Sequence, residues 1–299
     1  QMVENSFKCG YVSIIGRPNV GKSTLLNRFV EQKLSIVTRK PQTTRWNLQG
    51  IRTDEACQIV FIDTPGLQIN PELALNRYMN REVSNSLDFI DVILFVVEAM
   101  KWNELDENVL KLLASRNANT ILVINKIDKL TDKKQLLTFI QTLSKNTGIS
   151  ELVPVSADNG EGMDALLNII TDKLPVGPAM YPEDQVTDRN ERFFAAEFIR
   201  EKLINRLSDE LPYRLSVTID EFKNEQNLVH VYATIWVEKQ GQKSIVIGKE
   251  GKVLKSVGKA AREEMETLFE KKVNLKTWVK VRKKWADSEQ ALKQLGYHD

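Results

Sequence analysis

A glycine-rich segment near the start of the chain has the residue types and the spacing of a phosphate-binding loop. Its residues, Gly16-Arg17-Pro18-Asn19-Val20-Gly21-Lys22-Ser23, fit the pattern G-x-x-x-x-G-K-[ST] and are followed by Thr24. The glycines let backbone N–H groups curl around an anion, and Lys22 would reach the β- and γ-phosphates of a nucleotide. The Ser23 hydroxyl would bind Mg²⁺. We therefore predict that residues 16–24 bind the phosphates of a nucleotide.

A second motif, Asp63-Thr64-Pro65-Gly66, has the D-x-x-G pattern. In that pattern Asp63 would hold Mg²⁺ through a water, and the Gly66 N–H would meet the γ-phosphate. A match to this pattern alone is expected by chance. The match indicates a function only because it directly follows a strand-like run. The next residue is Leu67, where small signalling GTPases carry a glutamine that orients the attacking water. Leucine cannot hydrogen-bond water, and we expect slow intrinsic hydrolysis.

A third motif, Asn125-Lys126-Ile127-Asp128, would select the base. Asp128 can accept hydrogen bonds from the N1–H and 2-amino donors of guanine, an edge that adenine lacks. Lys126 would lie over the ring, and Asn125 would tie this segment to the phosphate loop. A backbone N–H of Ser156-Ala157 would meet the guanine O6. The N-K-x-D pattern by itself could be a helix cap, and only the set of motifs favours a nucleotide site.

Strands that alternate with helices would bring these motifs together. Strand-like apolar runs occupy residues 11–15, 58–62, 92–97, 120–124 and 152–155, and helical patterns occupy 24–30, 74–86, 106–116, 134–145 and 163–174. Residues 46–53 alternate and predict one antiparallel edge strand. The order predicts an α/β domain with a mostly parallel sheet and helices on both faces. Ligands bind such sheets beyond the carboxyl ends of the strands, where all these motifs fall.

The composition is that of an ordinary soluble globular protein. The chain has 299 residues, 42% of them apolar, which is enough for about two domains. No apolar run reaches the roughly 18 residues of a membrane span, and the polar residues 1–8 lack the core of a signal peptide. With Cys9 and Cys57 as its two cysteines, the chain is expected to contain no disulfide and no zinc site, and to be cytoplasmic.

The charge is unevenly distributed along the chain. Residues 1–180 have zero net charge, residues 181–238 carry −5 and residues 239–285 carry +9. A local excess of that size indicates a polyanion-binding surface in the C-terminal part. A solvated lysine-rich face is the alternative.

Clustered prolines and glycines, from Pro175 to Pro182, mark a domain boundary. Beyond it follow a helical pattern (192–207), two strand runs (213–221 and 228–237), the loop Gly248-Lys249-Glu250-Gly251, a helix (252–270), a strand (273–281) and a short helix (288–295). We predict a GTP-binding domain over residues 1–174, a linker over 175–187 and an α+β domain over 188–299.

This order of elements resembles a type II KH domain, in which the G-x-x-G loop clamps about four nucleotides. We expect the apolar run at residues 244–247, which includes Ile245 and Ile247, to be a strand that forms the floor of the RNA groove. The predicted RNA-binding residues are Ile245, Ile247, Gly248, Lys249, Glu250, Gly251, Lys252, Lys255, Lys259, Arg262, Lys283 and Lys284. Trp278 and Trp285 could stack on bases or pack in the core, and both alternatives stay open.

The motifs as a set, GRPNVGKS, QTTR at residues 42–45, DTPG, NKID and SAD, resemble the TrmE-Era-type, translation-factor-related GTPases. The whole chain resembles the Era group of that family, which joins a GTP-binding domain to one KH domain. In the family a switch I threonine gives Mg²⁺ a second contact, a role that we carry to Thr44, with Thr43 as the alternative. Asn19 matches a residue that helps hold K⁺ beside the phosphates, although it could instead cap the helix.

The resemblance implies a GTPase that depends on Mg²⁺, with Lys22, Thr44, Gly66 and Leu67 as catalytic or switch residues. Ser23, Thr44 and Asp63 would serve Mg²⁺, and a cation with backbone groups would replace the missing glutamine. No arginine finger is evident in the sequence. Arg39 and Arg45 are candidates on a mobile segment, where a solvated loop role fits them better.

The function that the resemblance implies is a GTP-controlled, slowly hydrolysing switch. It would bind 16S ribosomal RNA near its 3′ end and assist maturation of the small ribosomal subunit, as a monomer and with at most peripheral contact with the inner membrane. One alternative is an ATPase or kinase. Another is a tRNA-modification or tandem-domain GTPase, for whose additional domain the chain has no room. The third is a KH domain that binds another RNA, a protein or a lipid headgroup.

Overall fold

The structure is a computed structural model that describes residues 6–68, 72–116, 118–208 and 211–298. It divides into two compact units. The first comprises Gln1–Ser35, Thr44–Asn70 and Met79–Asp188, and the second comprises Ile36–Thr43, Pro71–Tyr78 and Arg189–Asp299. Two segments that we assigned from the sequence to the first domain, residues 36–43 and 71–78, thus belong to the second unit. The two units are described separately.

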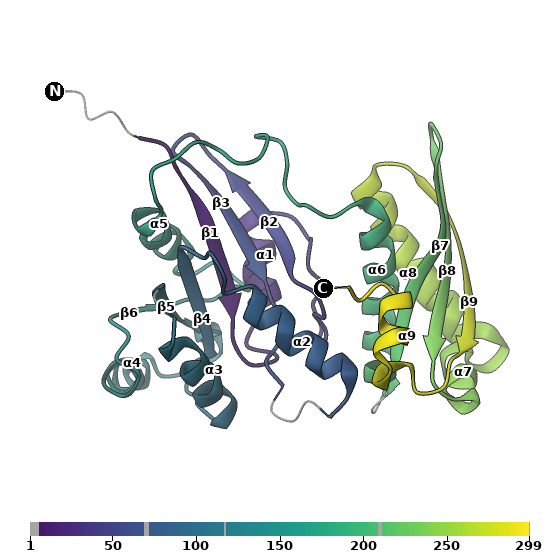
Figure 1. Cartoon of the computed structure of the whole chain (residues 1–299), viewed down its shortest axis with the longest axis horizontal. Helices are drawn as coiled ribbons and strands as arrows, with labels where there is room; N and C mark the ends of the chain where they lie inside the picture. The colour runs from purple at the N-terminus through teal and green to yellow at the C-terminus, as the bar shows by residue number, and fades with distance from the viewer. Residues whose placement is uncertain (1–5, 69–71, 117, 209–210, 299) are drawn as a thin grey trace. The chain divides into compact units, whose positions relative to one another are not determined.

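The first unit is built on a six-stranded sheet with the order β2-β3-β1-β4-β5-β6 (Figure 1). The strands are β1 (Lys8–Ile15), β2 (Leu48–Thr53), β3 (Cys57–Asp63), β4 (Val92–Glu98), β5 (Asn119–Asn125) and β6 (Glu151–Pro154). β2 pairs antiparallel with β3, and the other pairs are parallel. The predicted parallel sheet with one antiparallel edge strand is confirmed.

Helices connect the strands and pack on the sheet. They are α1 (Lys22–Val30), α2 (Ala74–Asn85), α3 (Glu104–Ala114), α4 (Lys133–Thr147) and α5 (Met163–Lys173), with a 3-10 turn, η1, at Ile127–Lys129. Every residue of β4 is buried, as expected of a central parallel strand covered on both faces. The core on one face joins β4 and β5 to α3 and α4, for instance through Val109 and Leu143. On α1, Phe29 stacks on Phe61 of β3 with ring centroids 4.2 Å apart.

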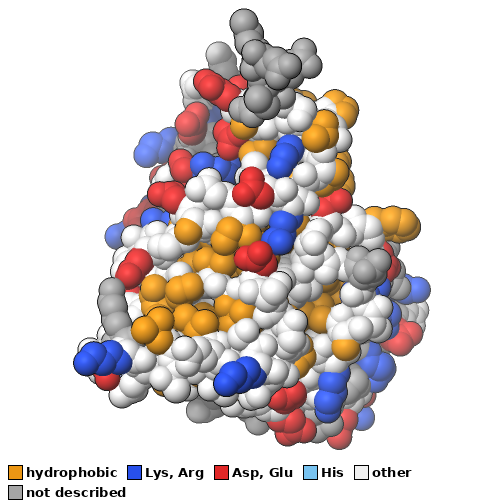
Figure 2. Space-filling model, turned by 90° about the vertical axis from the view of Figure 1, so that its left-hand side faces the viewer, with side chains coloured by type: hydrophobic (Ala, Val, Ile, Leu, Met, Phe, Trp, Pro, Cys, Tyr) orange, Lys and Arg blue, Asp and Glu red, His pale blue; other side chains and the backbone are white. Residues whose placement is uncertain are grey.

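The surface of the molecule is not uniformly charged. Figure 2 turns the left-hand side of Figure 1 to the viewer, and on that side acidic and basic side chains are interspersed. This mixture agrees with the zero net charge of residues 1–180. Within the described ranges, no helix is both long and apolar enough to span a bilayer.

The second unit contains a three-stranded sheet with the order β7-β8-β9. Its elements are α6 (Glu191–Arg206), η2 (Leu211–Arg214), β7 (Leu215–Asn224), β8 (Leu228–Val237), α7 (Gln240–Ile247), η3 (Lys249–Gly251), α8 (Lys252–Phe269), β9 (Lys272–Val281), η4 (Trp285–Asp287) and α9 (Glu289–Gln294). β8 pairs antiparallel with β7 and parallel with β9. α6 and α8 pack together on one face of this sheet, where Phe269 meets Phe222 edge to face.

One expectation about this unit is wrong: the apolar run that ends at Ile247 is a helix, α7, and not a strand. The helix starts where the Gln242 side chain accepts hydrogen bonds from the backbone N–H groups of Glu238 and Lys239, both at 2.9 Å. Its helical period buries Val246 and leaves Ile245 55% exposed. Ile245 and Ile247 therefore cannot form a strand-like floor of an RNA groove.

Candidate functional site

The glycine-rich loop links the end of β1 to the start of α1. Gly21 precedes the helix with a φ of 103°, a left-handed conformation that favours glycine. A Cβ atom at this position would lie 2.2 Å from Nδ2 of Asn125, so any side chain would displace that amide. The loop thus brings backbone N–H groups and the positive end of α1 to one place, as anion binding requires.

Lys22 is buried at the base of this loop, and its Nζ donates to the Arg17 carbonyl at 2.9 Å. Burial lowers the pKa of Lys22 from 10.5 to about 8, although the nearby Asp63 carboxylate acts in the opposite direction. A phosphate beside this ammonium would raise its pKa again, since an anion favours the charged form of a neighbouring cation.

The three residues expected to serve Mg²⁺ meet one another. The Ser23 Oγ donates to Asp63 Oδ2 at 2.7 Å and lies 2.9 Å from Thr44 Oγ1. Asp63 is completely buried at the end of β3, and burial raises the pKa of its carboxyl group. Its other oxygen, Oδ1, is buried without a hydrogen-bond partner among the described residues. Two hydroxyls and an unsatisfied carboxylate oxygen are a donor set that suits a hard cation such as Mg²⁺.

Of the two switch I threonines, Thr44 is the one that reaches this cluster. The hydroxyl of Thr43 instead lies 2.6 Å from that of Thr38. Arg45, which directly follows Thr44, is fully buried. The expectation that Arg45 lies on a solvated loop is therefore wrong, while Arg39 is exposed.

The D-x-x-G segment continues from β3 toward the phosphate loop. The Thr64 hydroxyl donates to the Ile14 carbonyl at 2.7 Å, which fixes the segment to β1. Gly66 lies against Pro18 of the phosphate loop. Leu67 packs on the hydrophobic core that includes Ile15 and Phe95, and so it contributes no polar group to the site.

The base-selecting segment follows β5 and joins the phosphate loop. The expected tie is present, because Asn125 Nδ2 donates to the Val20 carbonyl at 2.8 Å. Asp128 is exposed, and its Oδ1 accepts from Ser156 Oγ at 2.7 Å. The Ala157 N–H, one of the two backbone donors that we expected near guanine O6, donates to Asn125 Oδ1 at 3.0 Å, so a bound base would share this donor or take it over.

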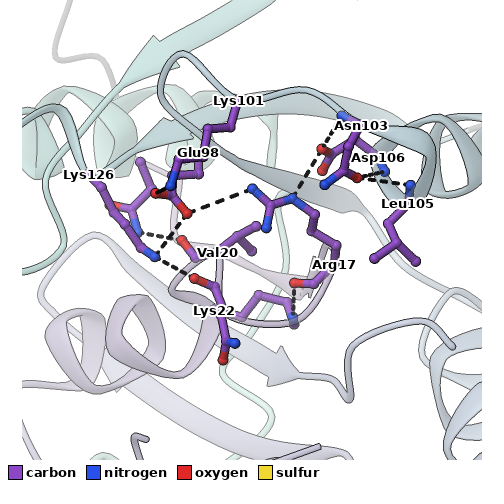
Figure 3. A network of polar contacts seen from close by, with 11 residues as sticks. Arg17, Val20, Lys22, Glu98, Lys101, Asn103, Leu105, Asp106 and Lys126 are labelled. Atoms are coloured by element: carbon purple, nitrogen blue, oxygen red, sulfur yellow. Dashed lines mark hydrogen bonds and ion pairs between the residues drawn. The ribbon is translucent and has the colours of Figure 1, made fainter. Parts of the chain in front are cut away.

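A chain of charged side chains connects the base-selecting segment to the phosphate loop (Figure 3). Lys126 donates to the Asn19 carbonyl and forms an ion pair with Glu98 at 3.2 Å. Glu98 lies 3.7 Å from Arg17, whose Nε donates to the buried Asp106 at 3.1 Å. Asp106 also closes the capping box that begins α3. The network therefore anchors both loops to α3.

The sequence analysis missed Glu98 and Asp106 of this network, and it also missed three residues closer to the metal and base sites. Ser35 is buried and donates to Asp63 Oδ2 at 2.6 Å. Asn27, one helical turn after Ser23, holds the loop that carries Ser35, because its side-chain oxygen accepts from the N–H groups of Leu34 and Ser35. Arg28 donates to the Ala157 carbonyl at 3.0 Å. The one available signal was the helical spacing of Asn27 from Ser23.

A pocket of about 450 Å³ lies beside Arg28. It is lined by Thr24, Asn27, Arg28, Glu31, Gln32, Lys33, Ala157 and Asp158. Thr24 lies in the first turn of α1 and Ala157 in the loop after β6, so the pocket adjoins the nucleotide site, although neither Lys126 nor Asp128 lines it.

The G-x-x-G loop of the second unit joins α7 to α8. Gly248 has a φ of 73° and a ψ of 172°, a region open essentially to glycine alone, and a Cβ there would lie 2.4 Å from Val253. Lys249, Glu250 and Lys252 are exposed. The turn therefore offers backbone and two ammonium groups to solvent, with Glu250 within 3.0 Å of Lys252.

The predicted stripe on α8 is only partly positive. Lys252, Lys255, Lys259 and Arg262 share one face by their helical spacing. Beyond the second turn the charge is offset, since Glu263 lies 3.9 Å from Lys259 and Glu266 lies 3.0 Å from Arg262. The positive end of the helix is thus the end at the G-x-x-G loop.

The two tryptophans differ in their surroundings. Trp285 is fully buried, donates to the Arg214 carbonyl at 3.2 Å and stacks on Tyr297, so it packs in the core and cannot meet a base. Trp278 is 47% exposed on β9. Lys283 and Lys284, between β9 and η4, are exposed.

Comparison with known proteins agrees with both halves of this description. Residues 11–126 match the family model described as 50S ribosome-binding GTPase, and residues 210–286 match the model described as KH domain. GTPase Era of Azotobacter vinelandii is 48% identical to this chain over 296 residues, which cover 99% of each protein. GTPase Era of Pseudomonas aeruginosa is 48% identical over 292 residues, which cover 98% of this chain and 96% of the relative.

Two solved structures are similar over nearly the whole length. One is a crystal structure of Era in complex with MgGDPNP and nucleotides 1506–1542 of 16S ribosomal RNA. The other is an Aquifex aeolicus Era variant bound to GDP and AlF4⁻. Each has a TM-score of 0.95 and 38% sequence identity, and each match covers 98% of this chain and 100% of the other.

Fold and site together define a P-loop GTPase domain followed by a KH domain, a GTP-hydrolysing enzyme with an RNA-binding type of module. The near-complete match at 48% identity makes the assignment more specific. The chain belongs to the Era GTPase family.

Proposed function

We propose that this protein is a GTP-controlled switch that binds small-subunit ribosomal RNA near its 3′ end and assists maturation of the small ribosomal subunit. The observation that carries the proposal is the meeting of Ser23, Thr44 and Asp63 around a buried, unsatisfied carboxylate oxygen. Thr44 belongs to a connecting segment, so its place in this cluster links the state of the nucleotide to the state of that segment.

In this proposal the phosphates of GTP lie on the N–H groups of residues 16–24, with Lys22 at the β- and γ-phosphates. Mg²⁺ at Ser23, Thr44 and Asp63 would neutralise the charge that develops on the phosphates. Asp128 binds the guanine, and Ser156 holds the Asp128 carboxylate in place. Leu67 packs against the core and offers no polar group, so we propose that backbone groups hold the attacking water and that K⁺ beside Asn19 assists there.

The segment before Thr44 supports coupling of this site to the KH fold. Residues 36–43 belong to the second unit, where the Val37 N–H donates to Glu201 Oε1 at 3.0 Å and Arg200 of α6 donates to the Thr43 carbonyl. Thr44, the next residue, bonds Ser23 in the first unit. A change at Thr44 when GTP is hydrolysed is therefore transmitted along the chain to a segment held by α6.

The RNA target is carried over from the similar Era structure that contains 16S ribosomal RNA. The exposed lysines of the G-x-x-G loop and the local charge of +9 over residues 239–285 support binding of RNA as such. We further propose that the protein works as a cytoplasmic monomer, with peripheral contact with the inner membrane. Both cysteines are free thiols, which suits a reducing compartment.

Matched variants of the two switch I threonines test the proposal. Thr44→Ala should weaken Mg²⁺-dependent binding of a non-hydrolysable GTP analogue at least about tenfold and leave GDP binding unchanged, because we expect Thr44 to meet the metal only in the GTP state. Thr43→Ala is the control, since its hydroxyl bonds Thr38. Equal effects of the two variants, or equal loss of GDP and analogue binding, would contradict the proposed role.

A further inference from the structure

The sheet of the second unit has a second face, opposite the one on which α6 and α8 pack. On β9 the odd-numbered residues Val273 and Val279 are buried, whereas Lys272, Lys276, Trp278 and Lys280 are exposed. On the same face of β8 lie His230, Tyr232, Thr234 and Trp236; Thr234 is buried, and Tyr232, Thr234 and Trp236 pair with Lys276, Trp278 and Lys280. We call this set of eight residues the open face. It is a different surface from the G-x-x-G loop, which lies between α7 and α8.

Aromatic rings lie together on the open face. Tyr232 and Trp278 meet edge to face with centroids 6.0 Å apart. Trp236 is half-buried, and its indole N–H donates to Thr218 at 2.9 Å, which fixes the ring. Trp278 itself is 47% exposed, a large fraction for a tryptophan on a sheet. The face thus presents a fixed aromatic surface to solvent.

Lysines alternate with these rings through the register of β8 and β9. Lys276 pairs with Tyr232, and Lys280 pairs with Trp236. Their Nζ atoms lie 5.4 Å and 5.8 Å from the centroids of those rings. Within the described part of the chain, neither lysine forms an ion pair with an acidic side chain. Both ammonium groups are therefore available to an anion that would lie beside the rings.

The acidic groups that border this face lie on β7 and on the turn from β7 to β8, where Glu225 is 3.7 Å from His230. Asp220 accepts from the Thr234 hydroxyl at 2.6 Å, and Glu221, which pairs with Tyr232, is exposed. At the start of β7, Ser216 is covered by Tyr297. The aromatic rings of the open face and the two lysines beside them thus lie on β8 and β9. A polyanion would bind along these two strands and not along β7.

We propose that the open face is a second RNA-binding surface, on which unpaired bases stack on Trp278 while the backbone phosphates lie on Lys276 and Lys280. The charge complementarity and the alternation of rings and cations are those of surfaces that bind single-stranded nucleic acid. The inference rests on the proposed RNA-binding function and extends it from the G-x-x-G loop to RNA that continues onto the sheet.

The test compares two single-stranded RNAs that match the 3′ end of small-subunit ribosomal RNA. One has about four to six nucleotides, which fill the G-x-x-G loop, and the other has about 20, which reach further. Trp278→Ala, and separately Lys276→Glu with Lys280→Glu, should weaken binding of the longer RNA about tenfold and leave the shorter one unchanged. Trp278→Phe should retain most of the affinity, because a phenylalanine ring still stacks.

Two further variants separate the possible failures. Lys145→Glu, on the exposed surface of α4, is the control for a change in net charge and should leave both affinities unchanged. Lys249→Glu should weaken both RNAs through the G-x-x-G loop. If Lys249→Glu has that effect while the open-face variants bind the longer RNA normally, the second surface is overturned and the proposed function stands. If the unaltered protein binds neither RNA, both are overturned. Open-face variants that lose only binding to purified small subunits would indicate a protein partner and also overturn the inference.

Discussion

Asp128 is the residue to which we assign selection of the base. It is exposed at the end of β5, and one carboxylate oxygen is held by Ser156, so its orientation is set before any base arrives. A guanine would offer two donors to this carboxylate, and an adenine would leave it unsatisfied. The family assignment as a GTPase agrees with that chemistry.

Substitution of Asp128 should therefore remove the preference for guanine. Asp128→Ala loses two hydrogen bonds to a charged group, each worth about 1.5–3 kcal/mol, and should weaken GTP binding between about 10²- and 10⁴-fold. Binding of ATP should hardly change. Calorimetric titration of both nucleotides checks this, with Asp164→Ala as a control on an exposed carboxylate of α5. Unchanged GTP affinity in Asp128→Ala would contradict the role.

Lys22 gives nucleotide binding a specific pH dependence. Its pKa in the nucleotide-free chain is about 8, and phosphates beside it should raise that pKa. Above pH 8 the free chain loses a proton that the bound chain keeps, so GDP affinity should fall by up to about tenfold per pH unit. Titrations at pH 8.5 in buffers of different ionisation enthalpy should show uptake of up to about one proton. Binding without proton uptake would show that Lys22 stays fully charged in the free chain.

The free energy of unfolding depends on pH with the opposite sign to that of nucleotide affinity. In the unfolded chain Lys22 has its ordinary pKa of 10.5, so between pH 8 and 10.5 the unfolded state holds more protons than the folded one. The contribution of Lys22 to the free energy of unfolding therefore rises with pH across that window in the absence of nucleotide.

At the scale of elements, α3 anchors the phosphate loop through Asp106, which makes two different sets of hydrogen bonds. Asp106 completes the capping box with Asn103 and also accepts from Arg17. Asn103→Ala removes the cap and should lower the free energy of unfolding by about 1 kcal/mol. Asp106→Ala removes the other half of the capping box and the buried partner of Arg17 as well, and should cost about 3 kcal/mol or more.

Urea denaturation of these two variants, with GDP binding measured alongside, tests the anchoring. The Asp106 variant should also bind GDP more weakly than the Asn103 variant, because Arg17 is part of the loop. Equal losses of stability and of GDP affinity in both variants would mean that the bond to Arg17 contributes nothing.

The parallel sheet could be predicted from the sequence because each strand is a local apolar run and each motif directly follows one. Ser23, Asp63 and Asn125 were found in the same way, since short motifs fix them. α7 was mistaken for a strand because a short apolar run fits both structures, and the cap by Gln242 is visible only in the folded chain. Ser35 could not be predicted, since it reaches Asp63 only through a loop that Asn27 folds back.

The two tryptophans also show how far a local sequence pattern can predict burial. Trp278 and Trp285 have similar basic neighbours in the sequence, yet one is exposed on the open face and the other is buried. The period of two along β9 places Trp278 outward, whereas the burial of Trp285 depends on the distant Tyr297 and Arg214. Local pattern therefore decides one case, and tertiary packing decides the other.

At the scale of the whole molecule, the account depends on communication between the nucleotide site and the RNA-binding unit. Residues 36–43 belong to the unit that contains the KH fold, and Thr44 belongs to the nucleotide site. The two are consecutive in the chain, and we propose that a change at Thr44 with the nucleotide reaches the segment in which the Val37 N–H donates to Glu201. The proposal that GTP controls RNA binding follows from this connection.

The most direct test of that central claim is the affinity for single-stranded RNA that matches the 3′ end of small-subunit ribosomal RNA. It should be measured with a non-hydrolysable GTP analogue and again with GDP, each over a series of salt concentrations. The account predicts tighter binding with the analogue, and in both states a steep loss of affinity with salt as counterions are released from the phosphates. Equal affinity in the two nucleotide states would leave an RNA-binding GTPase but contradict the switch.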